Sequence, residues 1–429
     1  MNNFIYQKLE DTKLDIISKN VKYIKIIDHP SVKVQLAAVH QDERVIEYIK
    51  DPCLEVQLIA VRKNENVIRY IASPFVKVQL AAVRQNGNAL QYIKDPSPEA
   101  QLAAVQQNGY AIQYIADPSA EVQLAAVQES GNAIQYIKNP SPEAQLAAVQ
   151  QNGYAIEYIN TPCLEVQLAA VQEDGRALQF IKDPSPAVQL AAVQEDGRAL
   201  QFIKDPSPAV QLAAVQEDGR IINFIENPSL EVQLAAVKQN IDAIEYIKDP
   251  SLEAQLTAVR QNGNAIEHID TPCLEVELTA VRQNGNSIEH IDTPCLEVQL
   301  AAVIQNGDAI KYIQDPCLKV QLAAVQQNGH AIRYIKHQFP EAQLVAVQHS
   351  GWAVVYITDP SVDIQAAAIY NNLEAIDLID YTDKRVLERA LQQYIADGNI
   401  YAILFILSVD ESFYDKLDCD TKLLLELDT

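Results

Sequence analysis

The sequence predicts an all-α fold, an α-solenoid built from sixteen 22-residue repeats of two helices each. From position 30 to position 381 a 22-residue pattern recurs without insertion or deletion, and a proline opens fifteen of the sixteen units, with Gln338 in the other. The ninth residue of every unit is alanine, and the twentieth is isoleucine. Because a unit of this length cannot enclose a core of its own, each unit must bury its apolar face against its neighbours.

The hydrophobic content of the chain is high enough for a continuous core, and its negative charge argues against nucleic acids and anionic membranes as binding partners. Hydrophobic residues make up 48% of the 429 residues, and the net charge of −24 disfavours nonspecific binding to nucleic acid or anionic membranes. The longest apolar run, 400–407, is too short to span a bilayer, and the first residues do not resemble a secretory signal. Five of the six cysteines are the second residue of their 22-residue units. Cysteines at this place in successive units would lie about one helix spacing apart, which is beyond disulfide reach. We therefore expect a cytoplasmic location, or the host cytosol for a viral or secreted effector.

Residues 96–117 illustrate one repeat when its proline is counted as position 1. The residue before the proline is Asp, Asn, Thr or Ser in all units but two, the exceptions being His29 and His337. Asp, Asn, Thr and Ser are N-cap residues, and proline suits the first helical position because its missing N–H would be unpaired there. We expect the first helix to begin at the proline and to run to about position 12.

The second half of the unit begins with a turn signal. Position 13 is Asn, Asp or Ser in every unit, and position 14 is Gly in twelve. This pair predicts that the first helix ends through a left-handed residue and that position 13 also caps the next helix. A shorter α or 3₁₀ helix is then expected over the Ala-Ile-x-Tyr-Ile segment.

A helical wheel sorts the first helix into faces. Positions 3, 5, 7, 9 and 10 are apolar, which leaves a polar strip at positions 4, 11 and 12. This pattern predicts a helix in the wall between neighbouring repeats. The constant alanine at position 9 marks a close helix crossing, where a longer side chain would clash.

Position 6 carries Gln in fifteen units and Glu277 in the other, although it falls inside the apolar arc. One interpretation is a polar ladder that grips a ligand. The other is a buried amide that bonds to loop backbone at each repeat junction, as buried polar groups require. Identical use in nearly every unit favours the structural interpretation.

Position 19 forms an aromatic ladder of ten Tyr, three Phe and two His that ends in Leu378. Because Phe and His replace Tyr, no single hydroxyl is needed at this position. Partly buried side chains stacked between repeats explain the ladder better than base stacking, since base stacking would require accompanying basic residues.

The ends of the chain differ from the array. Residues 1–29 are expected to form an N-terminal cap with a degenerate repeat, 30–381 the sixteen-repeat solenoid, and 382–429 a C-terminal helical cap. Lysines crowd the outer positions of the first segment, as a solvated capping repeat should show. Within the last segment, 383–395 and 399–407 predict longer helices.

The unit DPSPEAQLAAVQQNGYAIQYI, with its Asp-Pro and Val-Gln-Leu-Ala-Ala-Val elements, resembles the leucine-rich variant repeat. It is also similar to the LAAV-x-QNG repeats of an uncharacterised domain family of giant viruses, protists and intracellular bacteria. The resemblance covers 30–381 and implies alternating α and 3₁₀ helices stacked into a right-handed superhelix. It implies no catalytic residues. Two departures are the Gln at position 6, where the variant pattern commonly has Arg, and the period of 22, which is slightly shorter.

We searched the repeats for chemical sites. His268 and Cys273 recur one unit later as His290 and Cys295, which could form a tetrahedral metal site. However, both histidines merely occupy the aromatic ladder, and other cysteines share position 2 beside Tyr. There is no phosphate-binding loop, and no Ser/His/Asp or Cys/His arrangement occurs apart from residues that simply recur with the repeat. We therefore expect neither an enzyme nor a metal or other cofactor.

Variation between units is more informative about binding. Position 15 tolerates many residue types, which indicates exposure, and it places large or charged side chains on one edge of the solenoid. Tyr, Trp and Arg dominate interface energetics, so this edge is the candidate partner-binding surface, with a merely solvated edge as the alternative. The candidate contacts are Tyr110, Tyr154, Arg176, Arg198, Arg220 and Trp352.

These observations predict a non-enzymatic protein-binding scaffold that acts as an effector or antagonist of a host protein. We expect a protein partner, with neither direct nucleic-acid binding nor membrane binding; the oligomeric state is not indicated. Position 4 is acidic in eleven units, so an acidic nucleic-acid mimic is one alternative. Capture of a small ligand, such as a nucleotide, in the superhelical groove is the other.

Overall fold

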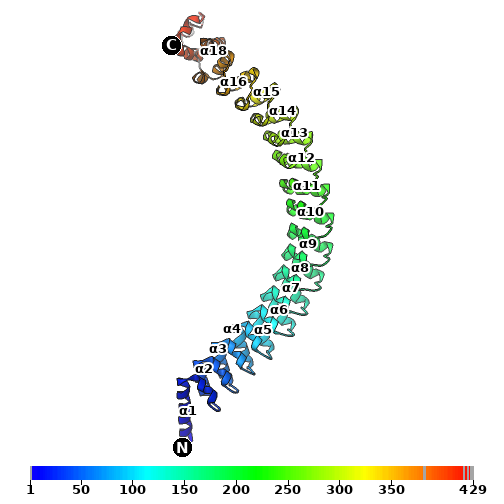
Figure 1. Ribbon diagram of the computed structural model, residues 1–429, viewed down its shortest axis with the longest axis vertical. Coiled ribbons are helices and arrows are strands. Elements are labelled where there is room, and N and C mark those ends of the chain that lie inside the picture. The colour runs from blue at the N-terminus through cyan, green and yellow to red at the C-terminus, as the bar shows by residue number, and fades with distance from the viewer. Residues whose placement is uncertain (1, 380–382, 419–420, 423–424, 426–429) are drawn as a thin grey trace. The chain divides into compact units, whose positions relative to one another are not determined.

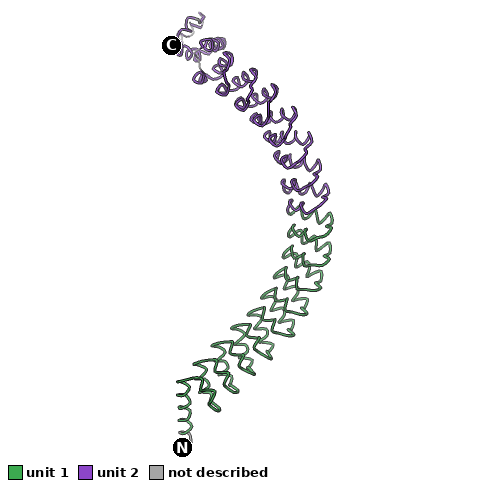
Figure 2. The backbone as a smooth tube through the Cα atoms, viewed as in Figure 1, with its two compact units in different colours: residues 1–217 green, residues 218–429 purple. Residues whose placement is uncertain are grey.

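The computed structural model describes residues 2–379, 383–418, 421–422 and 425, and their secondary structure is helical throughout, without a strand. The chain divides into two compact units, residues 1–217 and 218–429 (Figure 2). In each unit, α-helices (labelled in Figure 1) alternate along the chain with six-residue 3₁₀ helices, which are called η in the text. The predicted all-α repeat architecture is confirmed, and the second helix of each repeat is a 3₁₀ helix.

The first unit holds ten of the α-helices and the nine 3₁₀ helices between them. The α-helices are α1 (Asn2–Lys19), α2 (Val32–Gln41), α3 (Leu54–Lys63), α4 (Val76–Gln85), α5 (Pro98–Gln107), α6 (Ala120–Glu129), α7 (Pro142–Gln151), α8 (Leu164–Glu173), α9 (Pro186–Glu195) and α10 (Pro208–Glu217). The 3₁₀ helices are η1 (Val21–Ile26), η2 (Glu43–Tyr48), η3 (Glu65–Tyr70), η4 (Gly87–Tyr92), η5 (Gly109–Tyr114), η6 (Gly131–Tyr136), η7 (Gly153–Tyr158), η8 (Gly175–Phe180) and η9 (Gly197–Phe202).

The second unit has the same alternation and ends in a longer α-helix of 14 residues, an α-helix of 10 residues that is no longer than those of the repeats, and a 3₁₀ helix. Its α-helices are α11 (Leu230–Gln239), α12 (Leu252–Gln261), α13 (Leu274–Gln283), α14 (Leu296–Gln305), α15 (Leu318–Gln327), α16 (Pro340–His349), α17 (Val362–Asn371), α18 (Lys384–Asp397) and α19 (Ile400–Val409). Its 3₁₀ helices are η10 (Gly219–Phe224), η11 (Ile241–Tyr246), η12 (Gly263–His268), η13 (Gly285–His290), η14 (Gly307–Tyr312), η15 (Gly329–Tyr334), η16 (Gly351–Tyr356), η17 (Leu373–Leu378) and η18 (Glu411–Lys416). The helices predicted over 383–395 and 399–407 correspond to α18 and α19.

The α-helices begin two residues later than the sequence predicts. In α5 the N-cap is Ser97 at position 2, whose hydroxyl accepts a hydrogen bond from the Ala100 N–H at 3.2 Å. The carbonyl of Pro96 lies outside the helix because it accepts a bond from the Gln101 side chain at 3.1 Å. The residue before the proline is therefore not the cap, and at Asp51 and Asp183 it adopts a left-handed φ of 51°.

Position 13 joins the two helices as predicted, but it does so through extended backbone. Asn108 has a φ of −152°; its N–H bonds to Ala104 at the end of α5, and its side chain accepts from Tyr110 N at the start of η5. The prediction of a left-handed residue was wrong. Position 14 is glycine for a different reason, since a Cβ on Gly87 would come within 2.5 Å of the Ala104 carbonyl oxygen in the next repeat.

The core of each unit lies between its α-helices and its 3₁₀ helices. Within each unit, successive α-helices of the repeats pack against one another and against the 3₁₀ helices of their own and the preceding repeat, as with α5, η4 and η5. Every alanine at position 9, from Ala38 to Ala368, is fully buried, which confirms the predicted close crossing. The isoleucines at position 20 are also buried, apart from the partly exposed Ile203.

Position 3 differs from the prediction. It is apolar in the sequence and was grouped with the core positions, yet Leu164 in α8 is 53% exposed and Val76 in α4 is 45% exposed. The first residue of the α-helix is exposed or partly exposed in all sixteen repeats, so this position faces solvent. An apolar residue here therefore contributes little to stacking.

The glutamine ladder at position 6 is structural, as the favoured interpretation stated. Gln79 is buried; its amide group donates to the carbonyl of Pro74 at 3.1 Å, and its amide oxygen accepts from Ser97 N in the next repeat at 2.9 Å. Gln233 makes the same pair of bonds, to Pro228 and Ser251. These amides, like those of Gln57, Gln123 and Gln321, join the loops of two successive repeats, whereas the amide oxygens of Gln35 and Gln365 are buried without a hydrogen-bond partner.

Glu277, the only acid at position 6, provides a test of this ladder. When ionised, its carboxylate has no proton to donate to the Pro272 carbonyl, and burial raises the pKa of Glu277 above its usual value of 4.5. A raised folded-state pKa means that the protonated form is favoured in the fold. The contribution of this group to stability is therefore complete below the unfolded pKa and is lost as the pH rises through the raised folded value.

We predict that Glu277→Gln stabilises the protein at neutral pH by about 0.5–1.5 kcal/mol, because the amide restores one hydrogen bond. Urea denaturation at pH 4 and pH 7 should show a smaller gain at the acidic pH, where Glu277 can itself donate a proton. A gain that is equal at both pH values would contradict this role for the carboxyl group.

Candidate binding edge

The candidate binding edge comprises the side chains at positions 15, 18 and 19, all on the 3₁₀ helices. Position 13 caps the 3₁₀ helix through position 15 in fourteen of the sixteen repeats: the Asn152 side chain accepts from Tyr154 N at 3.1 Å, and Asp174 accepts from Arg176 N at 2.9 Å. The serines at 130 and 350 make no such bond, so Asn132 and Trp352 are not held in this way. This arrangement brings the variable side chains of each unit onto one edge, as the sequence predicts.

Positions 15 and 19 form ring pairs between repeats, which the sequence did not predict. The Tyr110 ring lies edge-on to Tyr136 of the next repeat, with centroids 6.1 Å apart, and Tyr154 is paired with Phe180 in the same way at 5.7 Å. The rings at position 19 are therefore part of the edge rather than an interior stack, and most of them are about two-fifths exposed. The paired rings are 26 residues apart in the chain, and the sequence alone does not show which positions of successive repeats meet.

Asparagine at position 15 has a structural role that its variability concealed. The Asn108 side chain donates to the Asn88 oxygen of the preceding repeat at 3.0 Å, and Asn152 donates to Asn132 in the same way at 2.8 Å. Four of the five asparagines at position 15, all but Asn66, connect repeats in this way. Units with Tyr, Arg or Trp forgo this bond and present a larger surface instead.

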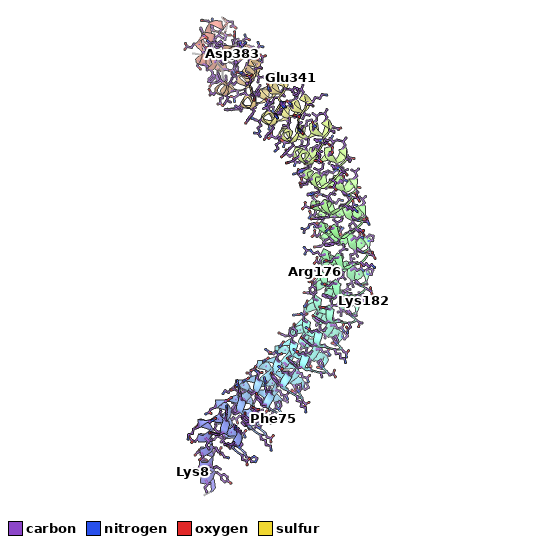
Figure 3. All side chains as sticks on the ribbon, in the orientation of Figure 1. Lys8, Phe75, Arg176, Lys182, Glu341 and Asp383 are labelled. Atoms are coloured by element: carbon purple, nitrogen blue, oxygen red, sulfur yellow. The ribbon has the colours of Figure 1, made fainter. Side chains whose placement is uncertain are left out.

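The first unit carries four of the six predicted contact residues. Tyr110, Arg176 and Arg198 are exposed, and Tyr154 is half-buried (Figure 3 labels Arg176). The Arg176 guanidinium lies 3.5 Å from the Asp174 carboxylate and 3.4 Å from that of Asp196. Burial, with the negative charge of Asp174, raises the pKa of the Tyr154 hydroxyl. Along this part of the edge, two tyrosine rings are thus followed by Arg176, which is paired with two aspartates, and by Arg198.

The second unit carries the remaining two contact residues, which do not form one cluster. Arg220 forms an ion pair with Asp218 at 3.1 Å, and Trp352 lies six repeats further along the chain. Trp352 is 43% exposed. Its side chain makes no hydrogen bond and no ring contact with a described residue.

Position 18 carries a cation in three units and an acid in six. The Arg69 guanidinium lies 4.0 Å from the centre of the Tyr92 ring in the next repeat, and the Lys311 ammonium lies 4.5 Å from that of Tyr312. In these cation–π contacts the charged end of the side chain covers one face of the ring. A binding partner would reach that face only by displacing the cation.

A cavity of about 1000 Å³ lies beside this edge in the second unit. It is lined by the loops around Gln338, the position where proline is missing. The Gln338 amide donates to the carbonyl of Ile332 at 3.1 Å and to that of Tyr356 at 2.9 Å, so it bridges two repeats. The cationic side chains of Arg333 and Lys336 are among its lining residues.

The histidine and cysteine pairs that suggested zinc lie in separate rows. His268 and His290 flank Glu267 on the binding edge, at 3.4 and 3.8 Å, whereas Cys273 and Cys295 are exposed N-cap residues of α13 and α14. In the described parts of the chain no group of three or more His, Cys, Asp or Glu is placed to hold a metal ion. A helix long and apolar enough to cross a membrane is likewise absent from those residues.

Comparison with protein-family models, with characterised proteins and with solved structures gives no match. The resemblance to the leucine-rich variant repeat therefore remains a prediction from sequence. Function has to be argued from the geometry of this chain alone.

Proposed function

We propose that the protein is a non-enzymatic scaffold that binds another protein through the candidate binding edge. Trp352 supports this proposal most strongly. Stacking does not require an indole at position 15, since other units have Asn, Asp or Arg there. The Trp352 indole, the largest side chain found at this position, is instead 43% exposed and contacts no partner group among the described residues.

The energetics of interfaces favour such a residue as an anchor. Tryptophan, tyrosine and arginine are the side chains whose truncation most often costs 2 kcal/mol or more, because they bury a large area and lose few rotamers. The edge presents these three types at the one position where repeats differ. Core positions such as the alanines at position 9 are occupied by stacking and cannot discriminate between partners.

We predict that a photo-crosslinking amino acid at position 352 captures a specific protein, whereas the same probe at Tyr401 does not. Tyr401 is a suitable control because it is an aromatic residue on α19, outside the repeat array, and is 74% exposed. The captured protein should then bind Trp352→Ala about 30-fold more weakly than the wild type, which corresponds to about 2 kcal/mol.

The Trp352→Ala variant should retain its stability within about 0.5 kcal/mol, because the indole is a surface group. Thermal melting checks this point before any affinity is compared. If the captured protein binds Trp352→Ala and the wild type equally, and changing the arginines at 176, 198 and 220 to alanine has no effect either, the edge is not the binding surface.

A second candidate function, capture of a small anionic ligand, is favoured by the cavity near Gln338. Its lining brings together Arg333, Lys336 and His337 with the rings of Tyr334 and Tyr356. Cations and aromatic faces suit a nucleotide-like molecule. Native mass spectrometry of the purified protein tests this candidate, since a retained ligand would add a discrete mass that Lys336→Ala should lose.

A further inference from the structure

A row of exposed leucines in the second unit is not explained by the fold. Position 3 is the first residue of each α-helix, and in five consecutive repeats it is leucine. The side chains of the first four are 45–47% exposed, and that of the fifth is partly exposed. The five residues are Leu230, Leu252, Leu274, Leu296 and Leu318.

Stacking does not require leucine at this position. The first unit has leucine at this position only at 54 and 164 and places Pro98, Ala120, Pro142 and Pro186 at the same point of other α-helices, which have the same length and also pack against their neighbours. A contiguous series of exposed apolar side chains on a protein surface commonly marks a binding site.

The leucines lie side by side because their helices do. Each of α11 to α15 packs against the next, so residues at the same position of successive helices are neighbours. Leu234 and Leu300, one turn further along their helices, are partly exposed on the same face. Ile304, a further turn along α14, is 64% exposed where other repeats mostly carry polar residues.

An acidic row follows the leucines. Each of the first four leucines is followed by an exposed glutamate, and none of these carboxylates forms an ion pair or side-chain hydrogen bond with a described residue. These glutamates are Glu231, Glu253, Glu275 and Glu297. Negative charge at a helix N-terminus is favourable by itself, but it does not account for the leucines beside it.

We propose that this leucine–glutamate row, formed by the four Leu-Glu pairs and Leu318, is a docking surface for a basic amphipathic helix of a partner protein. The apolar face of such a helix would cover the leucines, and its flanking Lys or Arg side chains would pair with the glutamates. Neighbouring α-helices lie roughly 8–10 Å apart, and seven residues of a helix rise about 10.5 Å, so ligand leucines spaced by seven would meet successive repeats.

Charge argues against the other occupants of an apolar surface. A second copy of the chain would bring its own acidic row toward this one, and like charges in contact are unfavourable. An anionic membrane would be repelled for the same reason. The proposal concerns a surface of α-helices and does not depend on the binding edge formed by the 3₁₀ helices.

The test uses the full chain and a synthetic helix of about 21 residues with leucine every seventh residue and lysines beside it. We expect the fluorescently labelled peptide to bind the wild type, with an affinity that falls as salt is added. A peptide with glutamate in place of lysine should not bind. The triple variant Leu252→Ala, Leu274→Ala, Leu296→Ala should bind the lysine peptide roughly 100-fold more weakly, because three half-exposed leucines no longer become buried.

Two controls keep the outcome interpretable. Alanine occurs naturally at this position as Ala120, so the triple variant should melt like the wild type, and Leu164→Ala in the first unit should leave binding unchanged. The variant Glu253→Gln, Glu275→Gln, Glu297→Gln should lose most of the salt dependence while retaining its fold. The proposal is overturned if the wild type does not bind the lysine peptide, if it binds the glutamate peptide equally well, or if the triple leucine variant binds as tightly. It is also overturned if sedimentation shows a wild-type dimer that the leucine variant loses, since the row would then join two copies of the chain.

Discussion

Replacing Ala192 by leucine is expected to lower the free energy of unfolding by about 1–3 kcal/mol, because the added side chain has no space at the helix crossing. Ala192 in α9 is fully buried. Its carbonyl oxygen lies so near the preceding repeat that a Cβ added to Gly175 would be only 2.4 Å away. Two backbones therefore approach each other at this point, and neither can move without separating the repeats.

Urea denaturation followed by far-ultraviolet circular dichroism measures the effect. The matched control is Arg198→Ala in the same repeat, where the truncated side chain is exposed and the change should stay within about 0.5 kcal/mol. Equal shifts of the two midpoints would mean that position 9 is not the packing contact between repeats.

Replacing Gln321 by leucine is expected to cost about 3 kcal/mol or more, the largest effect at a polar position. Gln321 is 1% exposed, and its amide group donates to the carbonyls of Pro316 at 3.0 Å and His337 at 2.8 Å. Its amide oxygen accepts from Phe339 N at 3.0 Å. Leucine fills the space but leaves three backbone groups without their partner, each at a cost of about 1–3 kcal/mol where water cannot replace it.

The same substitution five residues further on provides the control. Gln326 is exposed at position 11, where α14 carries Ile304, so Gln326→Leu should change the stability by less than about 0.5 kcal/mol. Amide hydrogen exchange should also show that Gln321→Leu loosens the loops around Pro316 and His337 before distant repeats, since each repeat contacts only its neighbours. A loss of protection spread evenly over the chain would contradict a local role for the amide.

The repeat architecture could be predicted because its signals are periodic and local. The period of 22, the alanine at position 9 and the isoleucine at position 20 each state one packing requirement, and the structure meets all three. The role of the glutamine at position 6 was also predictable, since a polar residue inside an apolar arc needs backbone partners.

Other features depend on contacts between repeats, which a single sequence does not show. Asp95 and Ser97 are both residues that commonly cap a helix N-terminus. Ser97 is the N-cap of α5, because the Pro96 carbonyl accepts a hydrogen bond from the Gln101 side chain and is not part of the helix. Similarly, Asn-Gly is a common left-handed ending, yet Gly87 is needed because the next repeat approaches it closely.

The candidate surfaces were predicted only in part. Variation at position 15 correctly indicated an edge with exposed side chains, but the ring pairs of Tyr110 and Tyr154 with the next repeat require the register between units. The helical wheel placed the leucines of position 3 in the core, because so many of the other positions are apolar that the wheel cannot identify which one faces solvent. Leu252 and its neighbours became candidates for binding only when their exposure was known.

The central claim is that the core residues serve the packing of repeats, whereas a partner binds the variable edge at positions 15, 18 and 19. Hydrogen exchange of the protein alone and with the partner captured at position 352 tests this claim most directly. We predict that binding protects amides of the 3₁₀ helix η16, at residues 351–356, and leaves the buried middle of α16 unchanged. Unchanged exchange in η16, with protection confined to α-helices, would contradict the claim.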